Sequence, residues 1–299
     1  MHTFALNVYF WDAPEQNRLL TECLGPALHA LRGGGAIEHF WFDRFDTRGP
    51  HLVLLLEAAA DREAEVRAGL GTALDAYLAT APSTRVLDPG ELERRHAQCR
   101  GKHLCSLDLL PGVEPNNSYR WVDVPHDAQV LRCTPGMDPR TVGALLTDQA
   151  LWSVDQLRRG GTTATAVRWA AGLTAAMERA GLDAAGFWRF YASTLVVRLR
   201  DPIAAGDPAV VEGLPRLIGP GNLAVFDPLW DSAGGAGAVW RGMDALARCV
   251  AAEPFESERT LFVRRFAHIV LAQLDQFVRF RIPLSLYAWH RTLLQPAAA

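Results

Sequence analysis

The chain has 299 residues, of which 49% are hydrophobic and 21% charged, and its formal net charge is −3. This length and composition are ordinary for a globular enzyme that buries a sizeable core. The balance of charge excludes the overall basic field typical of duplex nucleic-acid binding, and no apolar run reaches the roughly 20 residues that a membrane-spanning helix needs.

Two further features indicate the compartment. The N-terminus MHTFALNVYFWD has no charged leading segment and no small-residue cleavage site, so we expect no signal peptide. The cysteines are odd in number and scattered, which favours reduced thiols; they are Cys23, Cys99, Cys105, Cys133 and Cys249. We therefore predict a cytoplasmic protein.

The first sixty residues predict the order strand, helix, strand, turn, strand. The expected elements are a strand at 3–11, a helix from Asp12 to Gly33, and strands at 37–43 and 51–57. Asp12 is a typical helix cap, and Pro14 suits the first turn. A turn rich in Gly and Pro joins the last two strands. This order favours an α+β fold with a small antiparallel sheet.

The rest of the chain predicts mostly helix. We expect helices at 61–80, 139–159, 162–180, 184–199, 238–252 and 257–281, and short strands at 119–124 and 129–133. Residues 201–238 are rich in Gly and Pro and are expected to be loops, and Pro283 is expected to break the last helix. The C-terminal half is thus mostly helical, and we expect one domain over residues 1–299.

Motifs for metals and cofactors are weak in this sequence. The segment HAQCRGKHLC holds His96, Cys99, His103 and Cys105. Their spacing matches no familiar zinc knuckle, and the neighbouring Arg and Lys repel a cation, so we favour a structural or surface stretch over a metal site. The chain contains no GxGxxG, GxxxxGK[ST] or GxSxG element. We expect no metal and no cofactor.

The C-terminal region carries residue types suited to acid–base chemistry. Ser285, Tyr287 and His290 offer a hydroxyl, a phenol and an imidazole close together in the chain, and we take them as catalytic candidates. They are otherwise ordinary residues of an exposed terminus. In the preceding helix, one face is either solvated or the polar wall of a cleft. The candidate substrate-binding residues are Asp275, Gln276, Arg279, Arg281, His268 and Arg44.

One segment resembles a family pattern. Residues 42–56 read FDRFDTRGPHLVLLL, which is similar to the pattern FxRYxDPxGPHLRLRL. That pattern is found in the C-terminal elimination domain of class I lanthipeptide dehydratases and in its stand-alone relatives of thiopeptide biosynthesis. The resemblance continues through Leu145–Gln149 and into the last long helix. It implies the fold of the elimination domain over most of the chain.

The departures from the pattern are as informative as the match. In elimination domains the strand after Pro-His carries two arginines two residues apart, which share one face of the strand and suit a glutamyl carboxylate. Those positions are Val53 and Leu55 in this sequence, and the family's C-terminal histidine falls at Asp275 or Gln276. The resemblance therefore implies that this chain has the fold of the elimination domain but lacks the residues that bind glutamate.

An elimination-domain fold without the glutamate-binding residues resembles the thiopeptide pyridine synthases. The resemblance implies a cofactor-independent formal [4+2] cycloaddition between two dehydroalanines of a thiazole-containing precursor peptide. Water and leader peptide are lost, and the pyridine core and macrocycle form. The expected partner is the precursor peptide, and other peptide-modifying enzymes are further candidates. Two alternatives stay open: a glutamate-elimination subunit of a split dehydratase, and a non-catalytic subunit that binds the leader peptide.

Overall fold

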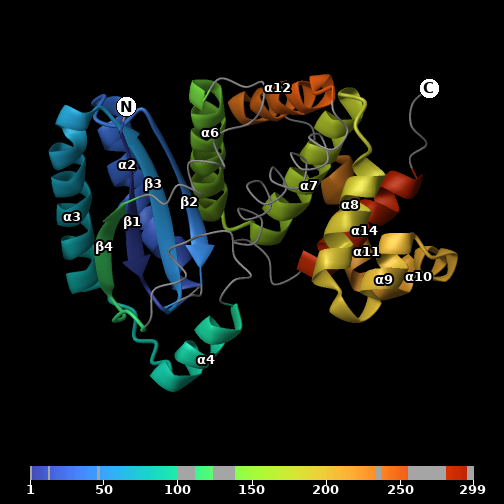
Figure 1. Cartoon of the computed structure of the whole chain (residues 1–299), viewed down its shortest axis with the longest axis horizontal. Coiled ribbons are helices and arrows are strands. Elements are labelled where there is room, and N and C mark those ends of the chain that lie inside the picture. The colour runs from blue at the N-terminus through green and yellow to red at the C-terminus, as the bar shows by residue number, and fades with distance from the viewer. Residues whose placement is uncertain are drawn as a thin grey trace. The chain divides into compact units, whose positions relative to one another are not determined.

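Figure 1 shows the computed structural model of the chain, which describes residues 2–12, 14–45, 48–99, 112–123, 139–232, 237–254 and 281–294. Contacts divide the described residues into two compact units, the first up to Gly160 and the second from Gly161 onward. The prediction of one family domain over residues 1–299 stays a prediction. No helix in these described ranges is long and apolar enough to cross a membrane.

The first unit is built on an antiparallel sheet of four strands in the order β2-β3-β1-β4. The strands are β1 (His2–Tyr9), β2 (His39–Phe45), β3 (His51–Ala58) and β4 (Ser118–Asp123). The predicted α+β fold with a small antiparallel sheet is confirmed. The strand expected at 129–133 lies outside the described residues.

The uncharged run Leu52–Leu56 is the middle of β3, a central strand that pairs with β1 on one side and β2 on the other. All five of its side chains are buried. Alternate residues point to opposite faces, so Leu52, Leu54 and Leu56 lie on one face of the sheet, and Val53 and Leu55 on the other. The continuous hydrophobic run therefore indicates a strand that is covered on both faces.

Helices cover the face that carries Leu52, Leu54 and Leu56. They are α1 (Glu15–Arg18), the π-helical segment η1 (Leu19–Leu24), α2 (Gly25–Gly33) and α3 (Glu63–Thr80), which follows the 3₁₀ turn η2 (Ala60–Arg62). The Arg67 guanidinium of α3 lies 5.5 Å from the ring centre of Phe4 and 4.7 Å from that of Trp121. Asp12 caps the first helix as expected, since its Oδ1 accepts from the Glu15 N–H at 3.2 Å. Helix α4 (Pro89–Cys99) lies between α3 and β4 in the chain.

Helix α6 (Pro139–Arg158) stands beside β2 at the edge of the sheet (Figure 1). The Thr147 hydroxyl accepts from the Phe40 N–H at 2.9 Å and donates to the Gly143 carbonyl at 2.9 Å. Close approach requires a glycine at position 143, because a Cβ there would lie 2.6 Å from His39 Nδ1. Next to this contact, His39 and Glu57 form a buried pair at 3.1 Å. The helix thus supplies a partner to the edge strand in place of a fifth strand.

The second unit is helical. It contains α7 (Thr162–Arg179), α8 (Ala184–Leu195), η4 (Val197–Leu199), α9 (Arg200–Ala205), α10 (Pro208–Ile218), α11 (Pro220–Asp231), α12 (Ala238–Ala252) and α14 (Arg281–Leu294). Trp188 and Trp289 are buried in its core, and the Trp188 indole N–H donates to the Thr174 hydroxyl at 2.8 Å. The helices expected at 162–180, 184–199 and 238–252 are confirmed. The one expected at 257–281 falls outside the described ranges.

The prediction of loops at 201–238 was wrong, because this segment forms α9, α10 and α11. Asp207 caps α10 by accepting from the Ala209 N–H at 2.8 Å, and Pro208 follows in the first turn. Gly219, with a φ of 87°, ends α10, and Pro220 opens α11. The glycines and prolines that suggested loops instead mark helix ends, where both residue types are also favoured.

Whether Pro283 ends the helix expected at 257–281 stays a prediction, because that helix lies outside the described residues. Pro283 lies in the first turn of α14, where the missing N–H removes no hydrogen bond because the first N–H groups of a helix have no partner within it. Ser285, Tyr287 and His290 are consequently helical residues. Ser285 and Tyr287 are buried, which excludes a frayed, exposed terminus at these two positions.

The contact between α6 and β2 leads to a stability prediction. Replacing Thr147 with Val keeps the shape but leaves the buried Phe40 N–H without its acceptor, which typically costs about 1–3 kcal/mol. Thr147→Ser keeps the hydroxyl and is the matched control. Urea denaturation should show a clearly lower free energy of unfolding for Thr147→Val than for Thr147→Ser. Equal stabilities would mean that this hydrogen bond does not hold α6 to the sheet.

Candidate functional site

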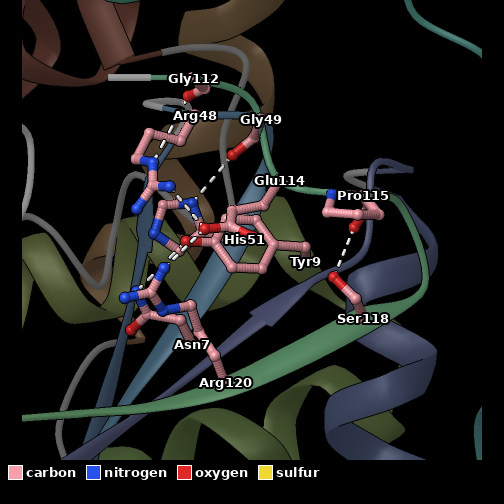
Figure 2. A network of polar contacts seen from close by, with 10 residues as sticks. All are labelled: Asn7, Tyr9, Arg48, Gly49, His51, Gly112, Glu114, Pro115, Ser118 and Arg120. Atoms are coloured by element: carbon pink, nitrogen blue, oxygen red, sulfur yellow. Dashed lines mark hydrogen bonds and ion pairs between the residues drawn. The ribbon is translucent and has the colours of Figure 1, made fainter. Parts of the chain in front are cut away.

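The sheet face opposite α1–α3 carries a network of polar side chains, which Figure 2 shows from close by. We call it the sheet network; its side chains come from Asn7, Tyr9, Arg48, His51, Glu114, Ser118 and Arg120. Asn7 and Tyr9 lie on β1, His51 on β3, and Ser118 and Arg120 on β4. The register places them on one face, since Tyr9 pairs with His51 and with Ser118, and Asn7 pairs with Arg120.

Glu114 is the centre of charge in the sheet network. Its Oε1 accepts from Arg48 Nη2 at 2.5 Å and from Arg120 Nη1 at 2.7 Å. Its backbone N–H donates to the Arg48 carbonyl at 2.9 Å, and Arg48 Nε donates to the Gly112 carbonyl at 3.4 Å. Two guanidinium groups on one carboxylate leave a local charge of +1. The network therefore attracts carbonyl oxygens and anions.

The Gly-Pro-His turn, residues 49–51, determines the backbone conformation next to Arg48. Arg48 and Gly49 have positive φ angles of 59° and 107°, and a Cβ on Gly49 would lie 2.8 Å from Trp11 Nε1. Glycine is thus required there by conformation and by space. The His51 Nδ1–H donates to the Gly49 carbonyl at 2.9 Å, and its ring lies 4.7 Å from that of Tyr9. The most specific motif of the sequence is accordingly a structural turn that orients Arg48.

Asn7 and Tyr9 form the buried end of the network. Asn7 Nδ2 donates to the Tyr9 hydroxyl at 3.5 Å, and both side chains are almost fully buried. Burial raises the pKa of Tyr9, so its phenol stays protonated at neutral pH. Among the described residues, Asn7 Oδ1 has no hydrogen-bond partner.

Val53 and Leu55 lie on the same face as the sheet network. Val53 pairs with Asn7, and Leu55 pairs with Ala5 on one side and with Trp41 on the other. The exposed fractions of Val53 and Leu55 are 5% and 8%. The face is therefore apolar at the two positions where the elimination-domain pattern has arginines, and its positive charge sits on the flanking turn and on β4.

A second cluster lies in the helical unit, around Tyr287 of α14. The Tyr287 ring lies between Phe226 and Trp230 at centroid distances of 5.1 and 5.5 Å. Its hydroxyl donates to Asp227 Oδ1 at 2.6 Å. Burial, together with this hydrogen bond, raises the pKa of Tyr287. Tyr287 is therefore a neutral hydrogen-bond donor throughout the physiological range.

Arg291 extends this cluster. It donates to Asp227 at 3.1 Å and also to Asp231. Tyr287 and Arg291 are four residues apart and share a helix face, and both meet the acidic side chains of α11. The sequence carried no signal for Asp227, which is 60 residues from Tyr287 and fell in the segment predicted to be loop.

The other two catalytic candidates are placed differently. The Ser285 hydroxyl is buried and donates to the Ile282 carbonyl at 2.9 Å. His290 is partly buried; burial lowers its pKa, and its Nδ1 has no hydrogen-bond partner among the described residues. Two residues apart on a helix, Ser285 and Tyr287 point in different directions. The catalytic roles of Tyr287, Ser285 and His290 stay predictions.

Of the candidate substrate-binding residues, Arg44 lies in the described part of the chain. Its Nη1 donates to Gln16 Oε1 at 3.2 Å and its Nη2 to Asn17 Oδ1 at 2.5 Å, and burial lowers its pKa to about 10. These contacts hold β2 against α1, on the face opposite the sheet network. His268, Asp275, Gln276 and Arg279, and the side chain of Arg281, lie outside the described part of the chain, so their roles stay predictions.

Only some of the His, Cys, Asp and Glu side chains that could bind a metal lie in the described part of the chain. No group of three His, Cys, Asp or Glu side chains in the described ranges is placed to hold a metal ion. The side chains of the HAQCRGKHLC segment fall outside those ranges. Cys23 and Cys249 are free thiols, and burial raises the pKa of Cys23 to about 11.

The apolar positions on the sheet face lead to a second prediction. The double change Val53→Arg and Leu55→Arg should lower the free energy of unfolding by about 3 kcal/mol or more, because unpaired buried charge is costly. It should not create glutamate elimination. Val86→Arg is the matched control, since Val86 is 88% exposed and should tolerate the charge. Thermal denaturation compares the three proteins; full stability of the double variant would contradict the buried placement.

Comparisons with known proteins agree with this architecture. Residues 4–121, which run from β1 into β4, match the model of the family described as lantibiotic biosynthesis dehydratase C-term. The chain is similar to the solved structure of the pyridine synthase TbtD from thiomuracin biosynthesis, with a TM-score of 0.66 and 16% identity over 98% of this chain and 97% of that one.

A second solved structure is the tRNA-dependent lantibiotic dehydratase MibB from Microbispora sp. 107891. Its TM-score is 0.49 at 16% identity, and this chain spans 28% of its length. No curated protein matches the chain. The sheet unit thus matches the lantibiotic dehydratase C-terminal family, and the chain as a whole has the fold of TbtD, which confirms the resemblance expected from the sequence.

Proposed function

We propose that this protein is a cofactor-independent pyridine synthase of thiopeptide biosynthesis. Its substrate is a precursor peptide with a leader and a dehydrated, thiazole-bearing core. One dehydroalanine and its neighbouring amide in the iminol form act as an azadiene, and a second dehydroalanine is the dienophile. The adduct loses water and then the leader peptide as an amide, which leaves the pyridine ring and closes the macrocycle.

One observation carries this proposal: the fold matches that of TbtD across nearly the whole of both chains, while the sheet face is apolar at Val53 and Leu55. The apolar positions argue against glutamate elimination, because no guanidinium stands at the place where the elimination-domain pattern has two. The scaffold is shared, and the chemistry differs at these positions.

The proposed reaction needs two contributions from the protein, the positioning of the two alkenes and a hydrogen-bond donor. Holding two alkenes in a near-attack arrangement can supply several kcal/mol of the barrier, and a hydrogen-bond donor assists the tautomerisation. We assign the donor role to Tyr287, the orientation of the amide to Ser285, and the acid–base role in water loss to His290. Because the Tyr287 hydroxyl donates to Asp227 in the structure, its action on the substrate requires it to exchange that acceptor for the peptide amide.

Mass spectrometry tests the proposal directly. The purified protein is incubated with a dehydrated, thiazole-containing precursor peptide, and a heat-denatured sample is the control. A pyridine synthase releases the leader amide and leaves a macrocycle that has also lost water. A glutamate-elimination subunit would instead convert a glutamylated serine to dehydroalanine, and a leader-binding subunit would change no mass. Either of these two results would replace the proposal.

The C-terminal cluster leads to a kinetic prediction. Removing one hydrogen-bond donor that acts in the transition state typically lowers the rate on the order of 10² to 10³. We expect Tyr287→Phe to show a loss of this size under single-turnover conditions and Ser285→Ala a smaller one, with leader affinity unchanged. If both variants cyclise at the wild-type rate, the chemistry lies elsewhere, and the polar face of residues 257–281 becomes the next region to test.

Binding of the leader peptide is predicted separately. Strand β4 is an outer strand of the sheet, paired with β1 on its inner side, and an extended leader can add to such an edge. We expect the leader alone to bind, and its affinity to fall as salt is raised if Arg18, Arg44 or Arg48 contributes to binding. Fluorescence anisotropy with a scrambled leader as control measures this. If the leader peptide shows no detectable affinity, the prediction of separate leader binding is wrong.

A further inference from the structure

The sheet network has an excess of one positive charge. Arg48 and Arg120 both donate to Glu114 Oε1, at 2.5 and 2.7 Å, and we call these two side chains the arginine pair. Figure 2 shows both guanidinium groups turned toward that carboxylate. Two cations and one anion leave a net charge of +1. Neighbouring guanidinium groups favour an anionic ligand, above all a carboxylate, which they hydrogen-bond in a fork.

The other carboxylates of this sheet face lie too far from Arg120 to neutralise it. On the described strands of this face they belong to Asp43 and Glu57. The pairing register puts Asp43 three strand spacings from Arg120, which is about 14 Å between backbones. That distance exceeds the Debye length of roughly 10 Å at 0.1 M salt. Glu57 is already paired with His39 at 3.1 Å.

The arginine pair lies at the border of the sheet, where solvent reaches it. The side chain of Arg120 is 41% exposed, and those of Arg48 and Glu114 are 13% and 19% exposed. In the described part of the chain, Arg120 donates to Glu114 through Nη1, and a guanidinium has several further N–H donors. A ligand can therefore contact Arg120 directly, without any buried side chain moving aside.

The neighbouring backbone holds the two guanidinium groups in place before any ligand binds. Arg48 Nε donates to the Gly112 carbonyl at 3.4 Å, and the Glu114 N–H donates to the Arg48 carbonyl at 2.9 Å. Arg120 lies on β4, which is paired with β1. Side chains that are already ordered lose little conformational entropy when a ligand binds. The arginine pair is therefore preorganised for an anion.

We propose that the arginine pair binds a carboxylate of the peptide substrate, and that Arg120 is the residue that contacts it. The carboxylate belongs to an acidic side chain or to the C-terminus of the precursor peptide, which offer the same two oxygens. The inference rests on the proposed function in one respect, namely that the ligand is the precursor peptide. The site is distinct from Val53 and Leu55, where the elimination-domain pattern has its arginines, and from the cluster around Tyr287.

Two substitutions that change the local charge in opposite directions test the site. Binding is measured by fluorescence anisotropy with a labelled precursor peptide. Arg120→Gln lowers the net charge of the cluster to zero and should weaken binding about fivefold, the upper end for a partly exposed ion pair. Glu114→Gln raises the net charge, keeps the volume and an acceptor oxygen, and should strengthen binding by a similar factor. A purely structural role would not move the affinity in opposite directions.

Arg120→Lys and Arg62→Gln are the controls. Arg120→Lys keeps a point charge and should bind the peptide more tightly than Arg120→Gln does. The side chain of Arg62 is 38% exposed and pairs with Glu65 at 2.7 Å, so Arg62→Gln removes a similarly exposed cation from the same unit and should leave the affinity unchanged. If Arg120→Gln binds the peptide like the wild type, or if Glu114→Gln weakens binding, the proposal is wrong.

Two altered peptides identify the source of the carboxylate. In one, the Asp and Glu side chains are replaced with Asn and Gln; in the other, the C-terminus is an amide. Arg120→Gln should not weaken binding of the peptide that lacks the recognised carboxylate, because both changes remove the same interaction. If Arg120→Gln weakens binding of both altered peptides as strongly as that of the unaltered one, no carboxylate contacts Arg120 and the proposal is overturned.

The binding data and the mass-spectrometric assay separate this inference from the reaction proposed above. If the precursor peptide binds in this charge-dependent way and is not cyclised, the pyridine synthase proposal fails and the carboxylate site stands. If it is cyclised while Arg120→Gln retains wild-type affinity, the reverse holds. If the peptide neither binds nor is cyclised, both proposals are wrong.

Discussion

The pairing register of β1 with β3 is the constraint on which the sheet unit depends. It sets Asn7 opposite Val53 and Leu6 opposite Leu54. A slip by one residue would exchange the two faces of the strand. In this register Leu52, Leu54 and Leu56 are buried on the helix-covered face. It follows that Val53 and Leu55 must face the sheet network, whatever chemistry that face performs.

The arginines of this sheet face stand at other positions than in the elimination-domain pattern. In the elimination-domain pattern two arginines lie in the middle of this strand, whereas here the guanidinium groups of Arg48 and Arg120 come from a turn and from the outer strand, and both contact Glu114. The strand is therefore apolar at these two positions, and the guanidinium groups stand at its border.

The helical unit carries a different kind of group. Tyr287 is buried between two aromatic rings, and its hydroxyl donates to Asp227. Arg291 pairs with the same aspartate, so the hydroxyl is held in one orientation by contacts from α11 and α14. In this arrangement the single O–H of Tyr287 is engaged by Asp227.

The sequence by itself determined the elements whose signals are local. The strands β1 and β3, the Gly-Pro-His turn and the helices α6 to α8 were all predictable, because each depends on residues close in the chain. Residues 201–238 were misjudged, since Gly and Pro favour both loops and helix ends. Only the tertiary structure decided the partners: Glu114 is 66 residues from Arg48, and Asp227 is 60 from Tyr287. Contacts over such separations are set by how whole elements pack, and a single sequence carries no periodic signal for them.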